Sequence, residues 1–113
     1  MKVNIIKKQT IEDYAATIRH KSSFEEWTSK VKFADWNSPG DILATFSKAD
    51  LLGKGSNRVV FNIAGNKYRM ICKYFFAKNI RKQRVHLYVC WIGTHKEYDK
   101  ICASSSQYTI NSY

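Results

Sequence analysis

The spacing of apolar residues changes once along this chain, and that change constrains the fold more than any other feature. Before the glycine-containing segment 51–57, apolar residues recur at helical spacing, as in Ile11, Tyr14, Ala15 and Ile18. After that segment they alternate with polar residues, as in β-strands. Helices followed by strands within 113 residues predict a single α+β domain over residues 1–113, with an antiparallel sheet packed on N-terminal helices.

The same patterns predict the individual elements. We expect helices over 10–21, 22–36 and 38–46, and strands over 3–7, 58–64, 67–76 and 84–92. Thr10 is the expected cap of the first helix, with Asp13 at capping-box spacing, and Ser38 precedes Pro39 at the start of the third. Gly65-Asn66 predicts a hairpin, so the three long strands should form an antiparallel meander that strand 3–7 can join. Residues 103–113 are expected to form a tail.

Strand alternation sorts the side chains of the two last strands into opposite faces. One face of 67–76 is apolar and suits packing on helices, whereas the other carries Lys67, Arg69, Ile71, Lys73 and Phe75. In 84–92 the same rule places Trp91 with Val85, Leu87 and Val89, and places His86, Tyr88, Cys90 and Ile92 opposite. The alternation therefore predicts a sheet with one open, cationic face.

The positive charge of the chain is concentrated in its second half. The formal net charge is +10, and residues 54–100 hold eleven of the nineteen Lys and Arg but two of the nine acidic residues. Such a balance favours an anionic partner: nucleic acid, an acidic protein or a membrane surface. Cations interleaved with aromatic rings on an open sheet suit single-stranded nucleic acid. Solvated Lys and Arg on an antiparallel sheet explain the same pattern equally well.

Several classes of protein are disfavoured by what the sequence lacks. It has no apolar run of about 18 residues and no signal-peptide pattern, so no membrane association is expected. The three cysteines form no C-x-x-C pair and are interpreted as free thiols in a reducing cytoplasm. No carboxylate cluster, His/Cys set or glycine-rich phosphate loop is present, so neither a metal nor a cofactor is expected.

Titratable residues are concentrated in the stretch WIGTHKEYDK, residues 91–100. If a helical turn begins after Gly93, His95 lies on one face with Tyr98 and Asp99. Histidine can exchange protons near neutral pH, and cleavage of RNA by its own 2′-hydroxyl needs only a base, an acid and cations. The stretch therefore indicates a metal-independent ribonuclease site. The alternative is a short surface helix whose charges are merely solvated.

Two windows of the sequence resemble a known family. VFNIAGNKYR (60–69) and GTHKEYD (93–99), with DILATFSKADLL (41–52) before them, are similar to HigB-type toxins of bacterial toxin–antitoxin pairs, within the RelE-like superfamily. The likeness covers roughly residues 36–101. It implies a curved antiparallel sheet on helices and an mRNA interferase, an endoribonuclease that cleaves mRNA at the translating ribosome in the bacterial cytoplasm. It also implies a HigA-type helix-turn-helix antitoxin, through which the toxin would affect operator DNA only indirectly.

The resemblance also suggests roles for individual residues. RelE-like enzymes place a basic residue in the middle of the sheet, where Arg69 falls, and catalytic side chains after the last strand. There the superfamily often has Arg, whereas this chain has His95. The predicted catalytic residues are Arg69 and Lys73 for the phosphate, His95 for acid–base catalysis, and Tyr98 as its partner or a stacking platform. The predicted RNA-binding residues are Lys67, Lys96, Arg58 and Asp99, of which Asp99 would orient His95 or Arg69 or support the fold.

Two other functions compete with this interpretation. A non-catalytic module that binds RNA or the ribosome explains the charge equally well, but it leaves the titratable cluster without a use. A DNA-binding regulator requires a basic recognition helix, and the helical half of the chain is nearly neutral.

Overall fold

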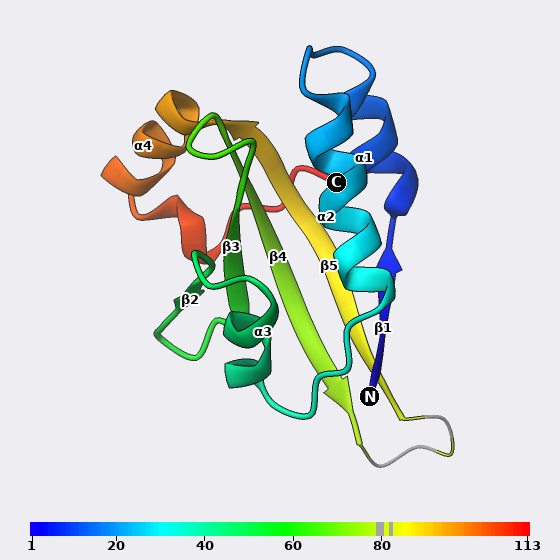
Figure 1. The fold of residues 1–113 in the computed structure, drawn as a ribbon. Coiled ribbons are helices and arrows are strands. Elements are labelled where there is room, and N and C mark those ends of the chain that lie inside the picture. The colour runs from blue at the N-terminus through cyan, green and yellow to red at the C-terminus, as the bar shows by residue number, and fades with distance from the viewer. Residues whose placement is uncertain (79–80, 82) are drawn as a thin grey trace.

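A five-stranded sheet forms the centre of the molecule in the computed structural model (Figure 1). Its strands are β1 (Lys2–Ile6), β2 (Asp50–Leu52), β3 (Arg58–Ile63), β4 (Tyr68–Ala77) and β5 (Arg84–Thr94), in the order β1-β5-β4-β3-β2. The predicted meander of β3, β4 and β5 is confirmed, and β1 joins it by pairing with β5 in parallel, so the sheet is mixed. The short strand β2 was not predicted: Leu51 and Leu52 fall within the glycine-containing segment 51–57, and Asp50 directly precedes it.

The structure describes residues 1–78, 81 and 83–113. Residues 79, 80 and 82, which fall between the strands predicted over 67–76 and 84–92, lie outside the described residues.

The helices lie on both faces of the sheet. Helices α1 (Lys8–Ala15), α2 (Lys21–Lys32) and α3 (Pro39–Thr45) cover one face, where Phe24, Trp27 and Ile42 pack in one core with Met70 and Leu87. Helix α4 (His95–Ala103) and the short 3-10 helix η1 (Ser106–Tyr108) follow β5 (Figure 1). Tyr98 of α4 and Ile110, beyond η1, pack on Ile71 of the opposite face. The architecture is thus an α+β domain, as predicted.

The prediction for the first helix was wrong at both ends. Helix α1 begins at Lys8, after Lys7 leaves β1 in the left-handed region with φ 64°. Thr10 therefore lies inside the first turn, where its N–H donates to the Lys7 carbonyl at 3.0 Å. The helix ends at Ala15, so it spans two turns rather than the predicted three. The turn at Lys7, which has no Gly or Asn to announce it, moved the start.

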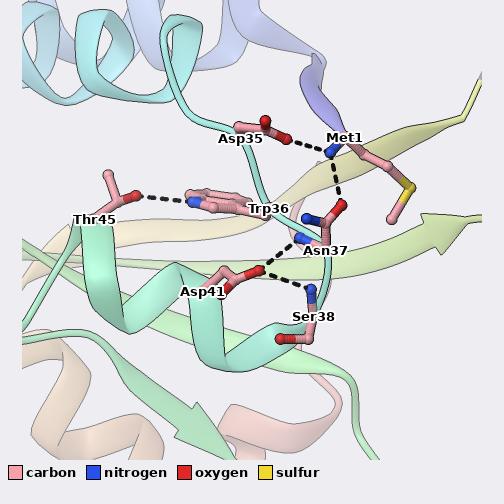
Figure 2. Close-up of polar contacts among 7 residues, drawn as sticks. All are labelled: Met1, Asp35, Trp36, Asn37, Ser38, Asp41 and Thr45. Carbon is pink, nitrogen blue, oxygen red and sulfur yellow. Dashed lines mark hydrogen bonds and ion pairs between the residues drawn. The ribbon is translucent and has the colours of Figure 1, made fainter.

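The start of α3 follows the prediction. Ser38 is its N-cap and Pro39 its first residue, and the Asp41 carboxylate accepts the N–H groups of Asn37 and Ser38 (Figure 2). Such a capping box satisfies backbone donors that the first helical turn leaves free.

The segment before α3 is bonded to the start of β1 (Figure 2). The Met1 amino group contacts the carboxylate of Asp35 and, at 3.1 Å, the side-chain oxygen of Asn37. The hydrogen bond and charge of that amino group lower the pKa of Asp35. Trp36 donates its N–H to the Met1 carbonyl and its indole N–H to Thr45 Oγ1 at 2.9 Å. These bonds tie the segment that leads into α3 to the start of β1.

A β-bulge in β5 reverses the predicted orientation of two side chains. Ile71 pairs with Trp91, but Cys72 pairs with Val89, so Cys90 is the extra residue. An extra residue shifts the alternation by one position beyond it. Trp91 therefore packs on the open face with Ile71 and Cys90, and Ile92 enters the helix-side core. The predicted face of Cys90 is thus confirmed, whereas the faces predicted for Trp91 and Ile92 by strict alternation were wrong.

Candidate active site

The end of β5 and the start of β4 bring the predicted site residues together. Arg69 of β4 pairs with Gly93 of β5, two residues before His95. Helix α4 begins at once, because Thr94 is its N-cap: the Thr94 hydroxyl accepts the Glu97 N–H, and the Glu97 carboxylate accepts the Thr94 N–H. The His95 N–H donates to the Lys67 carbonyl at 3.0 Å. The first turn of α4 is thus fixed beside the first residues of β4.

His95 stands between Arg69 and Asp99. Arg69 Nη2 lies 2.7 Å from His95 Nδ1, and His95 Nε2 lies 3.3 Å from Asp99 Oδ2. A guanidinium can only donate hydrogen bonds, so Nδ1 must carry the lone pair. The neutral ring then has its proton on Nε2, directed at Asp99. The contacts therefore define both the tautomer and the orientation of the imidazole.

Burial differs between the three side chains. Arg69 is 8% exposed and also donates from Nη1 to the Tyr68 carbonyl at 3.1 Å. The side chains of His95 and Asp99 are 48% and 63% exposed. The cation is thus held rigidly in the sheet, while the imidazole is open to a ligand. A phosphate that reached Arg69 would lie next to the proton-accepting nitrogen of His95.

Tyr98 lies one turn along α4 from His95 and packs inward. Its ring lies 6.2 Å from that of Trp91, and it joins the open-face cluster with Ile71. Burial, and then the neighbouring Cys102 side chain, raise the pKa of the Tyr98 hydroxyl, whereas the charge of Arg69 acts in the opposite direction. The hydroxyl is therefore protonated at neutral pH and within electrostatic range of Arg69.

Gly93 and Trp91 support this arrangement and were not predicted as site residues. A Cβ on Gly93 would lie 2.5 Å from Trp91 Cη2 and closer still to Cζ2. The indole thus lies across the bare Gly93 backbone and contacts Tyr98. A glycine inside a strand is a sequence signal for such close approach, but the bulge that directs Trp91 to this face left no pattern in the sequence.

Lys73 is not brought to His95. It lies four residues beyond Arg69 on β4, about 13 Å at the usual rise of a strand. Ile110 of the C-terminal segment packs on Ile71, which lies between the two, and the Ser112 N–H donates to the Cys90 carbonyl at 2.8 Å. The segment that follows η1 therefore crosses the open face between Arg69 and Lys73.

Arg58 lies beneath that segment. It is 7% exposed, and its Nη1 donates to the carbonyls of Ile110 at 2.6 Å and Gln107 at 3.2 Å. The expected tail is thus docked on the sheet. Its backbone carbonyls accept the hydrogen bonds of Arg58, a residue that we predicted to bind RNA. Lys67 and Lys96 are both exposed next to the site. The Lys67 carbonyl accepts the His95 N–H, and Lys96 follows His95 in the chain.

Two further features concern the class of protein. Among the described residues, no group of three or more His, Cys, Asp or Glu side chains is placed to hold a metal ion. None of the helices in the described part of the chain has the length and apolarity needed to cross a membrane.

Comparison with known families completes the description. Residues 20–101 match the model of a family described as HigB_toxin, the RelE-like toxic component of a toxin–antitoxin system. The chain belongs to this family. No curated protein matches the chain.

The match to the HigB toxins includes the elements that build the site. It covers β3, β4, β5 and the first seven residues of α4, and hence Arg69, His95 and Asp99. It stops at residue 101, before the segment that covers Arg58. As a component of a toxin–antitoxin system, this toxin has an antitoxin as its partner.

Proposed function

We propose that this HigB-type toxin is a metal-independent endoribonuclease that cleaves mRNA. The observation that carries the proposal is the Arg69–His95–Asp99 chain, in which a buried cation directs the lone pair of an exposed imidazole. A phosphate diester can exchange for His95 as the partner of Arg69, because charge-assisted bonds from a guanidinium to phosphate oxygens are strong. His95 Nδ1 is then free beside the bound phosphate.

The roles of the site residues follow from their hydrogen bonds and protonation states. His95 Nδ1 takes the proton of the 2′-hydroxyl, whose oxygen attacks the adjacent phosphorus. The bond to the 5′-oxygen breaks, and this oxygen takes a proton from the Tyr98 hydroxyl, which burial keeps protonated. Tyr98 is reprotonated as His95 returns its proton through solvent. The products are a 2′,3′-cyclic phosphate and a 5′-hydroxyl, and Arg69 stabilises the charge that develops on the phosphate.

Asp99 is a positioning residue in this proposal. Its carboxylate lies 3.3 Å from Nε2 and attracts the proton to that nitrogen, so Nδ1 stays unprotonated until the substrate arrives. Lys67 and Lys96 bind phosphates that flank the cleaved bond, because both are exposed beside His95. Lys73 lies too far along β4 to serve the same phosphate, so we place it on a more distant part of the RNA.

We further propose the cellular setting that family membership suggests. The toxin acts on mRNA at the translating ribosome in the bacterial cytoplasm, and a HigA-type helix-turn-helix antitoxin neutralises it. Operator DNA is then contacted by the antitoxin. The net charge of +10 supports a polyanionic substrate of this kind.

The test is to incubate purified toxin with translating ribosomes and to map new 5′ ends on the mRNA. Metal independence is tested separately, on ribosome-free RNA in EDTA. Replacement of His95 by Gln, or of Arg69 by Gln, should lower cleavage about 10²- to 10⁴-fold, the usual contribution of a general base or charge-stabilising donor. Tyr98→Phe should lower it by about 10²-fold. Asp99→Asn should cost less than ~10-fold, because exposed pairs contribute about 0.2–1 kcal/mol.

Matched controls separate loss of chemistry from loss of fold. His20→Gln removes an imidazole that instead contacts the Tyr68 hydroxyl, and Arg19→Gln removes an exposed guanidinium of the helical half. Both should cleave normally, and all variants should keep the far-UV circular dichroism of the wild type. Translation arrest without new 5′ ends, unchanged in His95→Gln, would instead establish the non-catalytic ribosome-binding module.

A further inference from the structure

A second cluster of cations and aromatic rings lies on the open face, on the other side of the C-terminal segment from His95. Lys73 pairs with Tyr88 across β4 and β5, Phe75 pairs with His86, and Arg84 pairs with Lys2 of β1. Directly paired residues point to the same face of a sheet. We call these six residues the distal platform. None of them is used by the chemistry proposed for His95 and Arg69.

The rings of the distal platform are available for stacking. The Phe75 and His86 rings lie 6.4 Å apart and are within 19° of parallel, and the Tyr88 ring lies 6.4 Å from that of His86. Phe75 is 58% exposed and Tyr88 41%. The exposed rings of Phe75 and Tyr88 flank the half-buried imidazole of His86, and such an exposed apolar surface marks an interaction site rather than a core.

The charges around these rings are positive. Lys73 and Arg84 are exposed, and in the described part of the chain neither has a carboxylate within salt-bridge distance. Their counter-charge must therefore come from solvent ions or from a ligand. Release of such ions is what drives cationic surfaces onto polyanions.

A cavity adjoins the platform. It has a volume of about 640 Å³ and lies between the sheet and the C-terminal segment, with Lys73, Phe75 and Tyr88 on one side and Asn111 and Tyr113 on the other. Lys7 also lines it. This volume falls within the usual range for sites that hold a small organic group. A nucleobase that enters it meets aromatic rings, and its phosphates meet lysines.

We propose that the distal platform binds single-stranded RNA, with bases on Phe75 and Tyr88 and phosphates on Lys73 and Arg84. The inference deepens the proposed function, because it assigns the toxin a second contact with its substrate, about 13 Å from Arg69 along β4. RNA fits better than an acidic protein segment, since the rings are flat, accessible and interleaved with unpaired cations. Binding there does not depend on cleavage.

The test is fluorescence anisotropy with a labelled 2′-O-methyl oligouridine of ten nucleotides, which has no 2′-hydroxyl to attack. Phe75→Leu and Tyr88→Leu should each weaken binding by about five-fold or more, as expected for loss of one base stack. Phe33→Leu is the matched control, because Phe33 is 75% exposed at the end of α2, away from the platform, and should leave binding unchanged. Poly-L-glutamate is a polyanion without bases, so its affinity for the two Leu variants should equal its affinity for the wild type.

The outcomes separate this inference from the proposed function. His95→Gln should lower mRNA cleavage at the ribosome and leave oligouridine binding intact, whereas Phe75→Leu should weaken oligouridine binding whether or not mRNA is cleaved. Unchanged oligouridine binding in both Leu variants would refute the distal platform, even if cleavage occurs. A loss that is equal for oligouridine and polyglutamate would also refute it, because a surface that serves acidic proteins such as an antitoxin needs no base stacking.

Discussion

Replacement of Gly93 by Ala tests whether the close contact between Gly93 and Trp91 supports the site. The new Cβ would lie 2.5 Å from Trp91 Cη2, whereas carbon atoms in contact prefer about 3.5–4.0 Å. The indole must therefore move by about 1 Å or more, away from its packing against Tyr98. Overpacking of this kind typically costs about 1–3 kcal/mol. The φ angle of Gly93 is not in the left-handed region, so the cost is steric.

Thermal unfolding measures this cost. At ~2.1 cal/mol/K per residue, the 113 residues give a shift of about 4 °C in Tm for each kcal/mol, so Gly93→Ala should lower Tm by about 4–12 °C. Gly53→Ala is the matched control, because a Cβ there meets no atom within 4 Å, and its Tm should stay the same or rise slightly. Cleavage should fall with Gly93→Ala, since the displaced indole pushes on the helix that carries His95.

A double-mutant cycle decides the mechanism. In a Trp91→Leu background the indole ring is absent. There the addition of Gly93→Ala should lower the free energy of unfolding by less than about 0.5 kcal/mol. An equal cost in both backgrounds would refute the steric explanation, and so would a Gly93→Ala variant as stable as the wild type.

Two further predictions follow from the packing of the open face. Arg58→Met removes two charge-assisted bonds to the C-terminal segment, so it should lower the free energy of unfolding by about 1.5–3 kcal/mol. It should also speed hydrogen exchange at the Ser112 N–H. Arg84→Met, an exposed change on the same face, should have neither effect. Because burial raises the pKa of Tyr98, the folded state holds that proton more tightly than the unfolded state, so stability should be full below about pH 10 and fall as the pH rises above it. Tyr98→Phe should reduce this alkaline loss in urea titrations at pH 8 and 11, and an unchanged loss would contradict the burial of the hydroxyl.

The C-terminal segment divides the open face into the two parts to which we assign separate roles. On one side lie Arg69 and His95, and on the other lies the distal platform around Lys73. The segment lies outside the family match, and Arg58 holds it through backbone carbonyls rather than side chains. Any residue of the segment would offer a backbone carbonyl to Arg58. The position of the segment therefore depends on Arg58 and on the apolar contact of Ile110 more than on the other side chains of the segment.

The close pairing of His95 with Arg69 also explains why the site is stable without substrate. Arg69 is nearly buried, and a buried cation needs acceptors for its N–H groups. His95 Nδ1 and the Tyr68 carbonyl supply them. A phosphate is a stronger acceptor than a neutral imidazole, so in the mechanism we propose the phosphate displaces His95 from Arg69, and this exchange frees the base.

The sequence by itself determined the local parts of this protein. The change of period across the segment 51–57 predicted helices before the long strands, and Ser38-Pro39 predicted the start of α3. The i, i+4 spacing predicted that Asp99 would meet His95, and alternation in β4 predicted that Arg69 and Lys73 would share a face. These features depend on spacing within one element, which the order of residues fixes directly.

Only the tertiary structure decided which parts of the open face work together. The bulge at Cys90 turned Trp91 toward Tyr98, although no residue type in β5 signals an extra residue there. The docking of residues 106–113 buried Arg58, which the sequence left as an open RNA-binding candidate. Both depend on pairing between segments far apart in the chain, where register and packing choose among several arrangements that the same local pattern allows.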